Sequence, residues 1–467
     1  MNSRWVKAGL TLLVGVVILC LPVPKGLSAE AWSFLALYMA TIAGIMIKPF
    51  SEPVVLLVAI SISSIFMKNI GTVLSGYANT TTWLVFSAFM LSQAFIETGL
   101  GRRIAYILLR RFGRTTLGVG YVAAVTDLVL SPATPSITAR TGGLVYPIFR
   151  SLAVTLDSEP GPTARRIGAY LTLLLYFISC TTAVLFITSL ATNPLLVTFA
   201  KEILGLEITW FQWAQAAFLP GFIILLALPY LVYKMYPPEI KQINNIELSE
   251  KGLAELGPMK TKEKILAVLF ILALIGWATG SITKINATAI AIAFITSCIV
   301  TGVVAWDSIA GAKSAWSTYI WYGGIIGLAS GLGKYKVFTW LSDTIAHNIS
   351  FEGYSMLVVL SVLLFISVVL RYIFVALGSF VPSIIPVLFT IGLIAEVPPM
   401  LLVMMLGASC GFGSMITHYS AASGPVLFGV GYVDQATWWK VGTVLCIFSI
   451  IVYFVIGLPY WKFLGLW

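Results

Sequence analysis

Long apolar runs separated by short polar segments set the pattern of this chain. They cover residues 8–21, 32–47, 54–66, 83–97, 210–233, 265–280, 287–305, 320–331, 356–375 and 438–464. A helix that spans a bilayer needs about 20 predominantly apolar residues, so the pattern predicts a bundle of membrane helices. The first run follows Arg4 and Lys7 and superficially resembles a signal sequence. We interpret it as a membrane span, because the rest of the chain is equally apolar.

Two stretches with prolines and small residues are predicted to form hairpins that enter the membrane without crossing it. Residues 131–143 hold Pro132 and Pro135 between apolar runs that are each too short to span. Proline cannot continue a helix, and the residue before it favours extended backbone. Residues 376–391, which also contain prolines, are predicted to form a second broken hairpin.

Two further apolar stretches are too long for one straight span and carry polar groups inside. Residues 170–200 are interrupted by Pro194, and residues 403–430 by the polar run 414–423. At 1.5 Å per residue, about 30 helical residues exceed the thickness of the hydrocarbon core. Irregular backbone at membrane depth is tolerated only where protein or a wet cavity surrounds it. In transporters such unwound helices hold the substrate.

The same order of elements occurs twice: a cluster of spans, a glycine turn, an interfacial helix, a broken hairpin and a long broken helix. Thr98-Gly99-Leu100-Gly101-Arg102 in the first half recurs as Ser330-Gly331-Leu332-Gly333-Lys334 in the second. We therefore divide the chain into halves 1–234 and 265–467, joined by the polar loop 235–264. Repeats with an odd number of crossings each would be inverted relative to one another.

Basic residues indicate the topology. Residues 102–114 place a stripe of arginines beside apolar positions, which suits a helix on the cytoplasmic membrane surface. Residues 337–350 would be its counterpart. The basic residues of 1–7 and 102–114 place both segments in the cytoplasm. An arginine-rich functional site over residues 102–114 is the alternative.

Composition narrows the class. The chain has 467 residues, of which 59% are hydrophobic and only 10% are charged. This balance indicates an all-α polytopic membrane protein of the cell membrane. The net charge of +10 is better explained by topology and anionic lipid headgroups than by nucleic acid. The five cysteines lack metal-ligand spacing, only two histidines exist, and no P-loop is present. We expect neither a metal site, nor another cofactor, nor ATP-driven transport.

Polar side chains at the four breaks are the candidate site. Ser136, Thr138 and Arg140 follow the first hairpin prolines, and hydroxyls with an arginine suit a carboxylate ligand. The helix breaks add further residues that can bind a substrate or a cation: Thr188, Ser189, Thr192 and Asn193 in the first half, and Thr417, His418, Ser420 and Ser423 in the second. His418 could act as a cation or proton carrier, and Arg371 is a further possible cation. The alternative for both arginines is a side chain that snorkels to an interface.

These residues resemble the divalent anion:Na⁺ symporter (DASS) family over nearly the whole chain. The resemblance is carried by two sets of motifs: Thr134-Pro135-Ser136-Ile137-Thr138-Ala139-Arg140 with Gly142-Gly143 and Tyr146-Pro147, and Thr417-His418-Tyr419 with Gly424-Pro425, Gly431-Tyr432 and Trp438-Trp439. The family carries Ser-Asn-Thr at each hairpin tip. Here the first tip reads Ser136-Ile137-Thr138, and the second reads Ala376-Leu377-Gly378 followed by Ser379. The resemblance thus adds Ile137, Gly378 and Ser379 to the candidate substrate-binding residues.

The resemblance implies a homodimer with an 11-span inverted-repeat fold, in which a transport domain moves like an elevator against a scaffold domain. The motifs look most like the exchanger branch, so dicarboxylates of the succinate, malate and 2-oxoglutarate class are the expected substrates. Arg140 and His418 lie where fixed positive charge could replace sodium. A fixed charge cannot leave after delivery, so an empty carrier would hold unneutralised cations, and return without an anion would be unfavourable.

Three alternatives remain. A sodium-coupled symporter of the same fold would depend on sodium for uptake. A membrane-embedded enzyme would need a convergent acid/base or metal cluster, and the apolar segments hold almost no Asp, Glu or His to build one. An anion channel is disfavoured by the paired hairpins, which favour alternating access by fold analogy.

Overall fold

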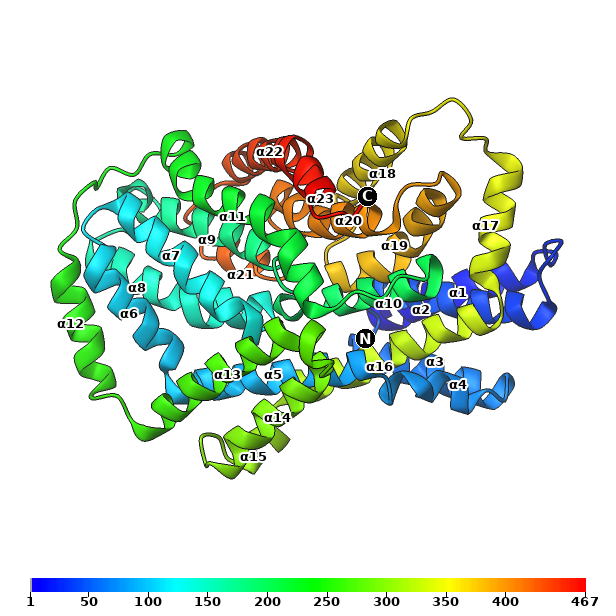
Figure 1. Cartoon of the computed structure of the whole chain (residues 1–467), viewed down its shortest axis with the longest axis horizontal. Coiled ribbons are helices and arrows are strands. Elements are labelled where there is room, and N and C mark those ends of the chain that lie inside the picture. The colour runs from blue at the N-terminus through cyan, green and yellow to red at the C-terminus, as the bar shows by residue number, and fades with distance from the viewer. Residues whose placement is uncertain (1) are drawn as a thin grey trace.

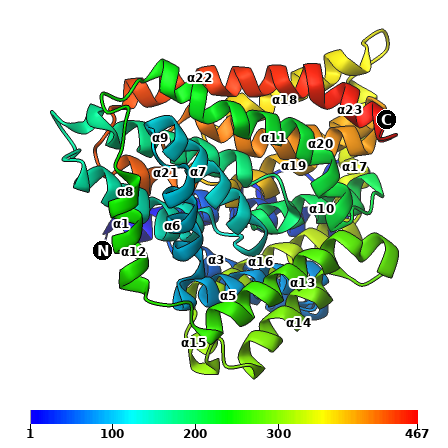
Figure 2. The same cartoon turned by 60° about the vertical axis from the view of Figure 1, so that its left-hand side comes forward.

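The computed structural model describes residues 2–467, which fold almost entirely into helices (Figure 1). Within these residues the single β pairing is an isolated bridge between Thr115 and Gln242. In Figure 1, α12 (Asn245–Leu256) and α17 (Val337–Asn348) run across opposite ends of the picture, and most other helices run between those ends. In Figure 2 the N-terminus lies on the side of α12 and the C-terminus on the side of α17. The predicted all-α membrane fold is confirmed.

The helices of the first half are α1 (Asn2–Cys20), α2 (Ala29–Ile47), α3 (Glu52–Phe66), α4 (Ile70–Leu74), α5 (Thr80–Thr98), α6 (Leu100–Phe112), α7 (Thr116–Leu130), α8 (Tyr146–Thr155), α9 (Gly168–Thr182), α10 (Thr192–Leu204) and α11 (Trp210–Met235). Those that follow are α12 (Asn245–Leu256), α13 (Thr261–Thr283), α14 (Ala287–Val300), α15 (Trp306–Ala310), α16 (Lys313–Lys334), α17 (Val337–Asn348), α18 (Met356–Leu370), α19 (Leu377–Ile394), α20 (Pro399–Phe412), α21 (Gly424–Phe428), α22 (Gln435–Val452) and α23 (Leu458–Phe463).

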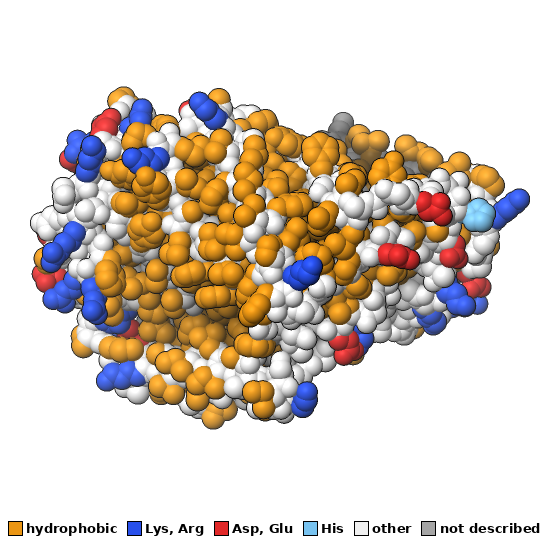
Figure 3. Space-filling view, turned by 45° about the horizontal axis from the view of Figure 1, so that its top comes forward, with side chains coloured by type: hydrophobic (Ala, Val, Ile, Leu, Met, Phe, Trp, Pro, Cys, Tyr) orange, Lys and Arg blue, Asp and Glu red, His pale blue; other side chains and the backbone are white. Residues whose placement is uncertain are grey.

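Eight described stretches of helix are long and apolar enough to cross a membrane, and α5 with α6, bent by 62°, forms a further candidate. On the face drawn in Figure 3, hydrophobic side chains cover the middle and charged side chains lie towards both ends, with a cluster of Lys and Arg at the end that carries α6, α8 and α12. This charge distribution is typical of the cytoplasmic end of a membrane protein. The amphipathic stripe predicted on residues 102–114 forms α6, but Arg103 faces inward and pairs with Glu263.

The first hairpin has a shorter tip than the 131–143 expected from its sequence. A 3₁₀ turn, η2 (Ser131–Ala133), follows α7, and the chain is irregular only to residue 136. The returning arm opens with the π-helical segment η3 (Thr138–Val145) and continues as α8. The predicted break is confirmed at the prolines, but Thr138 and Arg140 belong to the returning helix.

The second hairpin breaks earlier than predicted. The interruption lies at residues 371–376, and α19 runs without a break from Leu377 to Ile394, with Pro382 and Pro386 inside it. The expectation of a broken segment over 376–391 was wrong. Pro386 lacks the N–H that would bond the carbonyl of Pro382, but Tyr38 from α2 donates its hydroxyl to that oxygen at 2.8 Å. A partner from another helix thus stabilises the proline-containing segment as a helix.

Both long broken helices are confirmed. The first consists of α9 and α10 with the 3₁₀ turn η5 (Ile187–Ser189) between them. Pro194 lies in the first turn of α10, where no N–H partner is required. The second consists of α20, the 3₁₀ turn η6 (Gly413–Ile416) and α21.

The repeated glycine motif does not mark equivalent turns in the two halves. Gly99 ends α5 with a left-handed backbone, φ 75°. Gly331 lies inside the continuous helix α16, where a Cβ would collide with the ring of Phe34. Close packing explains the second glycine, whereas the left-handed turn explains the first.

Candidate functional site

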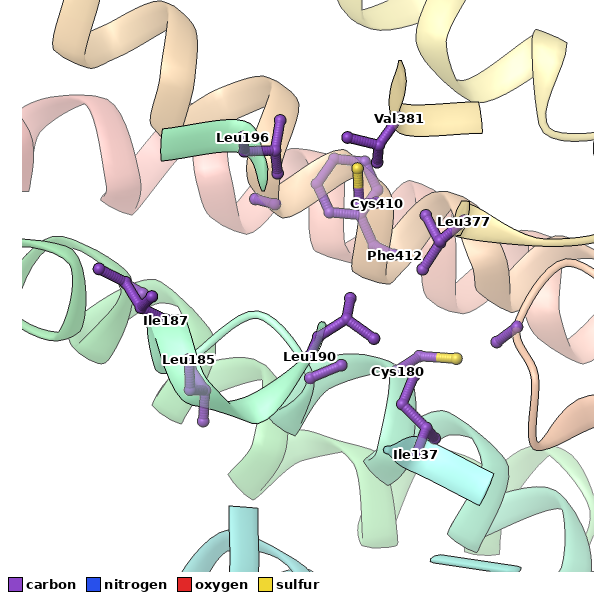
Figure 4. Packing of buried hydrophobic residues seen from close by; sticks show 14 of the residues in the cluster. Ile137, Cys180, Leu185, Ile187, Leu190, Leu196, Leu377, Val381, Cys410 and Phe412 are labelled. Atoms are coloured by element: carbon purple, nitrogen blue, oxygen red, sulfur yellow. The ribbon is translucent and has the colours of Figure 1, made fainter. Parts of the chain in front are cut away.

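The hairpin tips and helix breaks meet around α9. The backbone N–H of Ala191, in the first break, donates to the carbonyl of Pro135 in the first tip at 3.0 Å. Tyr176 on α9 donates its hydroxyl to the carbonyl of Thr417 in the second break at 2.7 Å. In Figure 4, Ile137 and Cys180 lie on one side of the packed centre, and Cys410 of the second half lies opposite. Thr182 of α9 also accepts a hydrogen bond from Arg140 of the first hairpin at 3.1 Å, so this one helix contacts the polar segments of both halves.

Arg140 lies in a fully buried ion pair with Asp127 of α7, Nε to Oδ2 at 3.1 Å. Its remaining nitrogens donate to the carbonyls of Thr134 (2.7 Å) and Ser189 (3.0 Å) and to the hydroxyl of Thr182 (3.1 Å). The guanidinium thus ties the hairpin tip to the helix break. Every nitrogen of Arg140 that can donate has a partner within the protein.

Asp127 changes the charge balance expected at the first hairpin. This residue, which was missed in the sequence, also accepts hydrogen bonds from the hydroxyls of Thr141, at 2.8 Å, and Thr182. The Asp127 carboxylate accepts three hydrogen bonds and lies in ion-pair contact with Arg140, so it is the counter-ion of that arginine. The expectation that Arg140 stands as an uncompensated cation was wrong. The available signal was a lone acid in an apolar run, 13 residues before the arginine.

The π segment gives the first hairpin one residue more than the second. The stretch from Ser136 to Pro147 is longer by one residue than the stretch from the aligned Ala376 to Pro386. A π-helical turn accommodates such an insertion, and π segments occur frequently at functional sites. Here the segment begins two residues before Arg140, which places the arginine on the Asp127 side of the arm.

Some of the other first-half candidates make hydrogen bonds or pack within the protein, and others have buried polar atoms without a hydrogen-bond partner. Ser136 accepts from the N–H of Ala139 at 3.2 Å, and Ile137 packs in the core. Thr138 is partly exposed. Asn193 donates to two carbonyls of the break, at 2.7 and 2.9 Å, but its Oδ1 has no partner. Three buried hydroxyls nearby also lack partners, those of Thr134, Ser189 and Thr192.

Arg371 is the second buried arginine of the site, and its environment differs from that of Arg140. It follows α18 at the second hairpin tip and is 0% exposed. Its Nη2 donates to the hydroxyl of Ser414 at 3.0 Å and to the carbonyl of Ser420. Its Nε and Nη1 have no hydrogen-bond partner, and no Asp or Glu of the described chain pairs with it. Its guanidinium lies 4.8 Å from the ring centre of Phe380.

The remaining second-half candidates are held by their neighbours. Gly378 faces Trp321, since a Cβ there would lie 3.2 Å from the indole, and Ser379 donates to the carbonyl of Ala376 at 3.0 Å. The hydroxyl of Thr417 pairs with that of Ser420, and the hydroxyl of Ser423 lies 3.1 Å from that of Ser179 on α9. These contacts shape the second break.

His418 acts as a neutral acceptor in this arrangement. Its Nδ1 accepts the indole N–H of Trp439 at 3.0 Å, which requires an unprotonated Nδ1. The ring stacks on Phe428, with centroids 4.1 Å apart. The expectation that His418 supplies a fixed positive charge is therefore contradicted, whereas its predicted contact with the substrate stays a prediction. Within residues 2–467, no group of three or more metal-binding side chains is present.

A cavity of about 530 Å³ lies beside the first break, and no feature of the sequence indicated it. Ile187 and Pro194 are among its lining residues. The first residues of α5, α11 and α14 also line it, so three helix N-termini with their partial positive charge face this space. Lys284 adds a cation, while Lys201 pairs with Glu207 at 2.6 Å and lowers the pKa of that carboxyl. The charged side chains of the lining are therefore two lysines and one carboxylate, that of Glu207.

Known proteins resemble this chain over its whole length. The family model described as "Sodium:sulfate symporter transmembrane region" matches residues 2–467. The inner membrane protein YbhI of Escherichia coli is 45% identical over 473 residues, covering 100% of this chain and 99% of that protein. The putative malate transporter YflS of Bacillus subtilis is 36% identical over 461 residues, covering 98% and 96%. The L-tartrate/succinate antiporter of Escherichia coli K12 is 30% identical over 479 residues, covering 98% of each chain.

Among solved structures, MtrF of Neisseria gonorrhoeae, described as illuminating a class of antimetabolite efflux pumps, superposes with a TM-score of 0.58. The alignment covers 98% of this chain and 94% of MtrF at 12% sequence identity. The likeness therefore concerns the fold.

Proposed function

The chain belongs to the sodium:sulfate symporter family of membrane transporters, and we propose that it exchanges dicarboxylates across the cell membrane. Succinate, malate and 2-oxoglutarate represent the substrate class. Relatives named for malate transport and for tartrate/succinate antiport support this class. The proposed mechanism is elevator-type alternating access in a homodimer, in which a transport domain that contains the hairpins and broken helices moves against a scaffold domain.

One observation carries the proposal: polar groups without partners gather at the hairpin tips and helix breaks, deep in an apolar protein. They are Thr134 Oγ1, Ser189 Oγ, Thr192 Oγ1, Asn193 Oδ1 and two nitrogens of Arg371. Buried polar groups are normally paired, and each unpaired one calls for an explanation. Hydroxyls and a guanidinium are the donors that recognise carboxylates. A small dianion bridging the two halves would accept from the hydroxyls and the guanidinium at once, whereas Asn193 Oδ1, an acceptor, would need a donor or a cation.

A fixed charge is the proposed physical reason for exchange as opposed to one-way transport. A cation that belongs to the protein stays in the site after the substrate leaves. Returning with that charge uncompensated in a low-dielectric interior is costly, so the carrier returns with a second anion. Arg371 of the second hairpin, which has no acid in ion-pair contact among residues 2–467, supports this proposal.

Sodium-coupled symport is the second candidate, and a specific observation favours it. The first hairpin tip and first break present four buried oxygens without partners, and hard cations such as Na⁺ are bound by oxygen ligands. Symport and exchange differ in what drives uptake.

The test is uptake of labelled succinate into proteoliposomes, with and without external sodium and with and without internal dicarboxylate. Exchange requires internal dicarboxylate and ignores sodium. Accumulation in empty vesicles under a sodium gradient would favour symport instead. Absence of succinate, malate and 2-oxoglutarate uptake under all conditions would reject the dicarboxylate assignment.

A further inference from the structure

We propose that Arg371, and not the Arg140 of the conspicuous hairpin motif, is the residue that binds a carboxylate of the substrate. This assignment rests on the proposed function and deepens it. It gives the anion-binding charge to the tip of the second hairpin, whose sequence departs furthest from the family signature.

Arg371 has free hydrogen-bond donors, whereas Arg140 has a partner at every nitrogen. A guanidinium has five N–H donors. In Arg140, Nε, Nη1 and Nη2 all donate to protein oxygens. In Arg371, Nη2 alone is engaged, which leaves the hydrogen on Nε and the two on Nη1. Arg371 can therefore donate from two nitrogens to a ligand without breaking an existing contact.

Arg371 also carries the uncompensated charge of the site. Asp127 and Arg140 sum to zero, while Arg371 has no acid in ion-pair contact among residues 2–467. Intramembrane ionisable residues are costly and mark functional sites by default. The cluster therefore carries one net positive charge, which matches one carboxylate. The second carboxylate of a dianion would be held by neutral donors.

The second helix break holds Arg371 in position. Ser414 and the carbonyl of Ser420 bind Nη2, and the Ser420 hydroxyl donates to the backbone carbonyl of Arg371 at 3.0 Å. Gly413 gives the side chain room, because a Cβ there would lie 3.3 Å from Arg371 Cγ. A ligand bound to this arginine would contact the hairpin tip and the break together. These two parts must move as one unit in alternating access.

The experiment measures succinate binding to the purified protein in detergent by titration calorimetry, with Arg371→Gln, Arg371→Lys and a matched control, Arg103→Gln. Arg103 is also a buried arginine, but it pairs with Glu263 outside the site. Loss of a hydrogen bond to a charged group lowers affinity by about 10- to 100-fold. We expect a loss of this size for Arg371→Gln, a smaller loss for Arg371→Lys, which keeps the charge, and none for Arg103→Gln.

A second measurement compares succinate with its half-amide, which carries one carboxylate. Wild-type protein should prefer succinate, and Arg371→Gln should reduce that preference. Should Arg371→Gln fail to fold, Arg371→Lys decides: succinate affinity equal to that of wild type would overturn the inference. If the wild-type protein binds no dicarboxylate, the proposed function fails, and the same variants are titrated with sulfate. Equal sulfate binding by wild type and Arg371→Lys would then reject Arg371 as the anion-binding residue.

Discussion

The Asp127–Arg140 pair should behave as one structural unit in a double-mutant cycle. Asp127→Ala removes a carboxylate that accepts three hydrogen bonds, and it leaves the Arg140 charge buried without a counter-ion. Arg140→Ala leaves the Asp127 charge and strips the carbonyls of Thr134 and Ser189 of a donor. Each single substitution therefore creates one buried, uncompensated charge.

The magnitude follows from the complete burial of both side chains. Breaking a buried ion pair by removing one partner costs about 3–5 kcal/mol. The double substitution removes both charges, so it should cost much less than the sum of the two. We expect a coupling free energy of at least about 2 kcal/mol, near the upper part of the range for residues in one network. Such a value would show that the pair stabilises the packing of the first hairpin tip against the first helix break.

The assay is the free energy of unfolding in mixed detergent micelles for wild type, both single variants and the double variant. A matched control is the exposed pair Lys201–Glu207, whose nitrogen and oxygen lie 2.6 Å apart but whose side chains are 66% and 75% exposed. Solvent screens such a pair, so its coupling should be far smaller than that of the buried pair. Additive effects at Asp127 and Arg140 would refute the reasoning, because additivity would mean that the two charges do not compensate each other.

Three further predictions concern other parts of the structure. Glu263→Ala should lower the free energy of unfolding by about 3–5 kcal/mol, because it leaves the buried Arg103 unpaired; Glu263→Ala and Arg103→Ala measured in the same cycle should be strongly coupled. Gly442→Ala should cost about 1–3 kcal/mol, because a Cβ there would collide with the carbonyl of Met415 in η6; a stability equal to wild type would show that α22 can move away. Asp434→Ala should cost about 0.5–2 kcal/mol at pH 7, since Asp434 caps α22. Hydrogen bonds from Thr437 lower the pKa of Asp434 in the folded state, so this difference should shrink as the pH falls through that pKa; a pH-independent difference would contradict the capping role.

Prolines and polar runs in the sequence predicted where the breaks lie better than how they are built. Pro132, Pro135 and the polar run 414–423 marked real interruptions, because proline and clustered hydroxyls destabilise a helix locally. Pro382 and Pro386 carry the same local signal, yet they lie within α19. The difference comes from a hydroxyl 344 residues away in the chain, which bonds the carbonyl that the second proline frees. A local pattern does not contain that partner.

In the candidate site, too, the positions of the polar residues could be predicted from the sequence, whereas their partners could not. Hydroxyls and arginines at the breaks were predicted from residue type and position, and those segments do come together around α9. Which arginine remains available for an anion could not be predicted. Arg140 lies in the stronger motif but pairs with Asp127, whereas Arg371 lies at the end of an apolar run and has no acid beside it. The protonation of His418 likewise depends on an indole N–H from α22.

The sequence by itself predicted the class of protein and the approximate positions of the breaks. The length of an apolar run and the position of a proline affect the backbone and its solvation locally, without contacts from distant segments. The charge balance of the site required the folded arrangement. Whether a buried arginine is neutralised depends on a carboxylate within a few ångströms, and electrostatic energy in a low-dielectric interior changes steeply over that distance. Asp127 reaches Arg140 because α7 and η3 fold back on one another. Arg371 stays uncompensated because no acid among residues 2–467 lies in ion-pair contact with it.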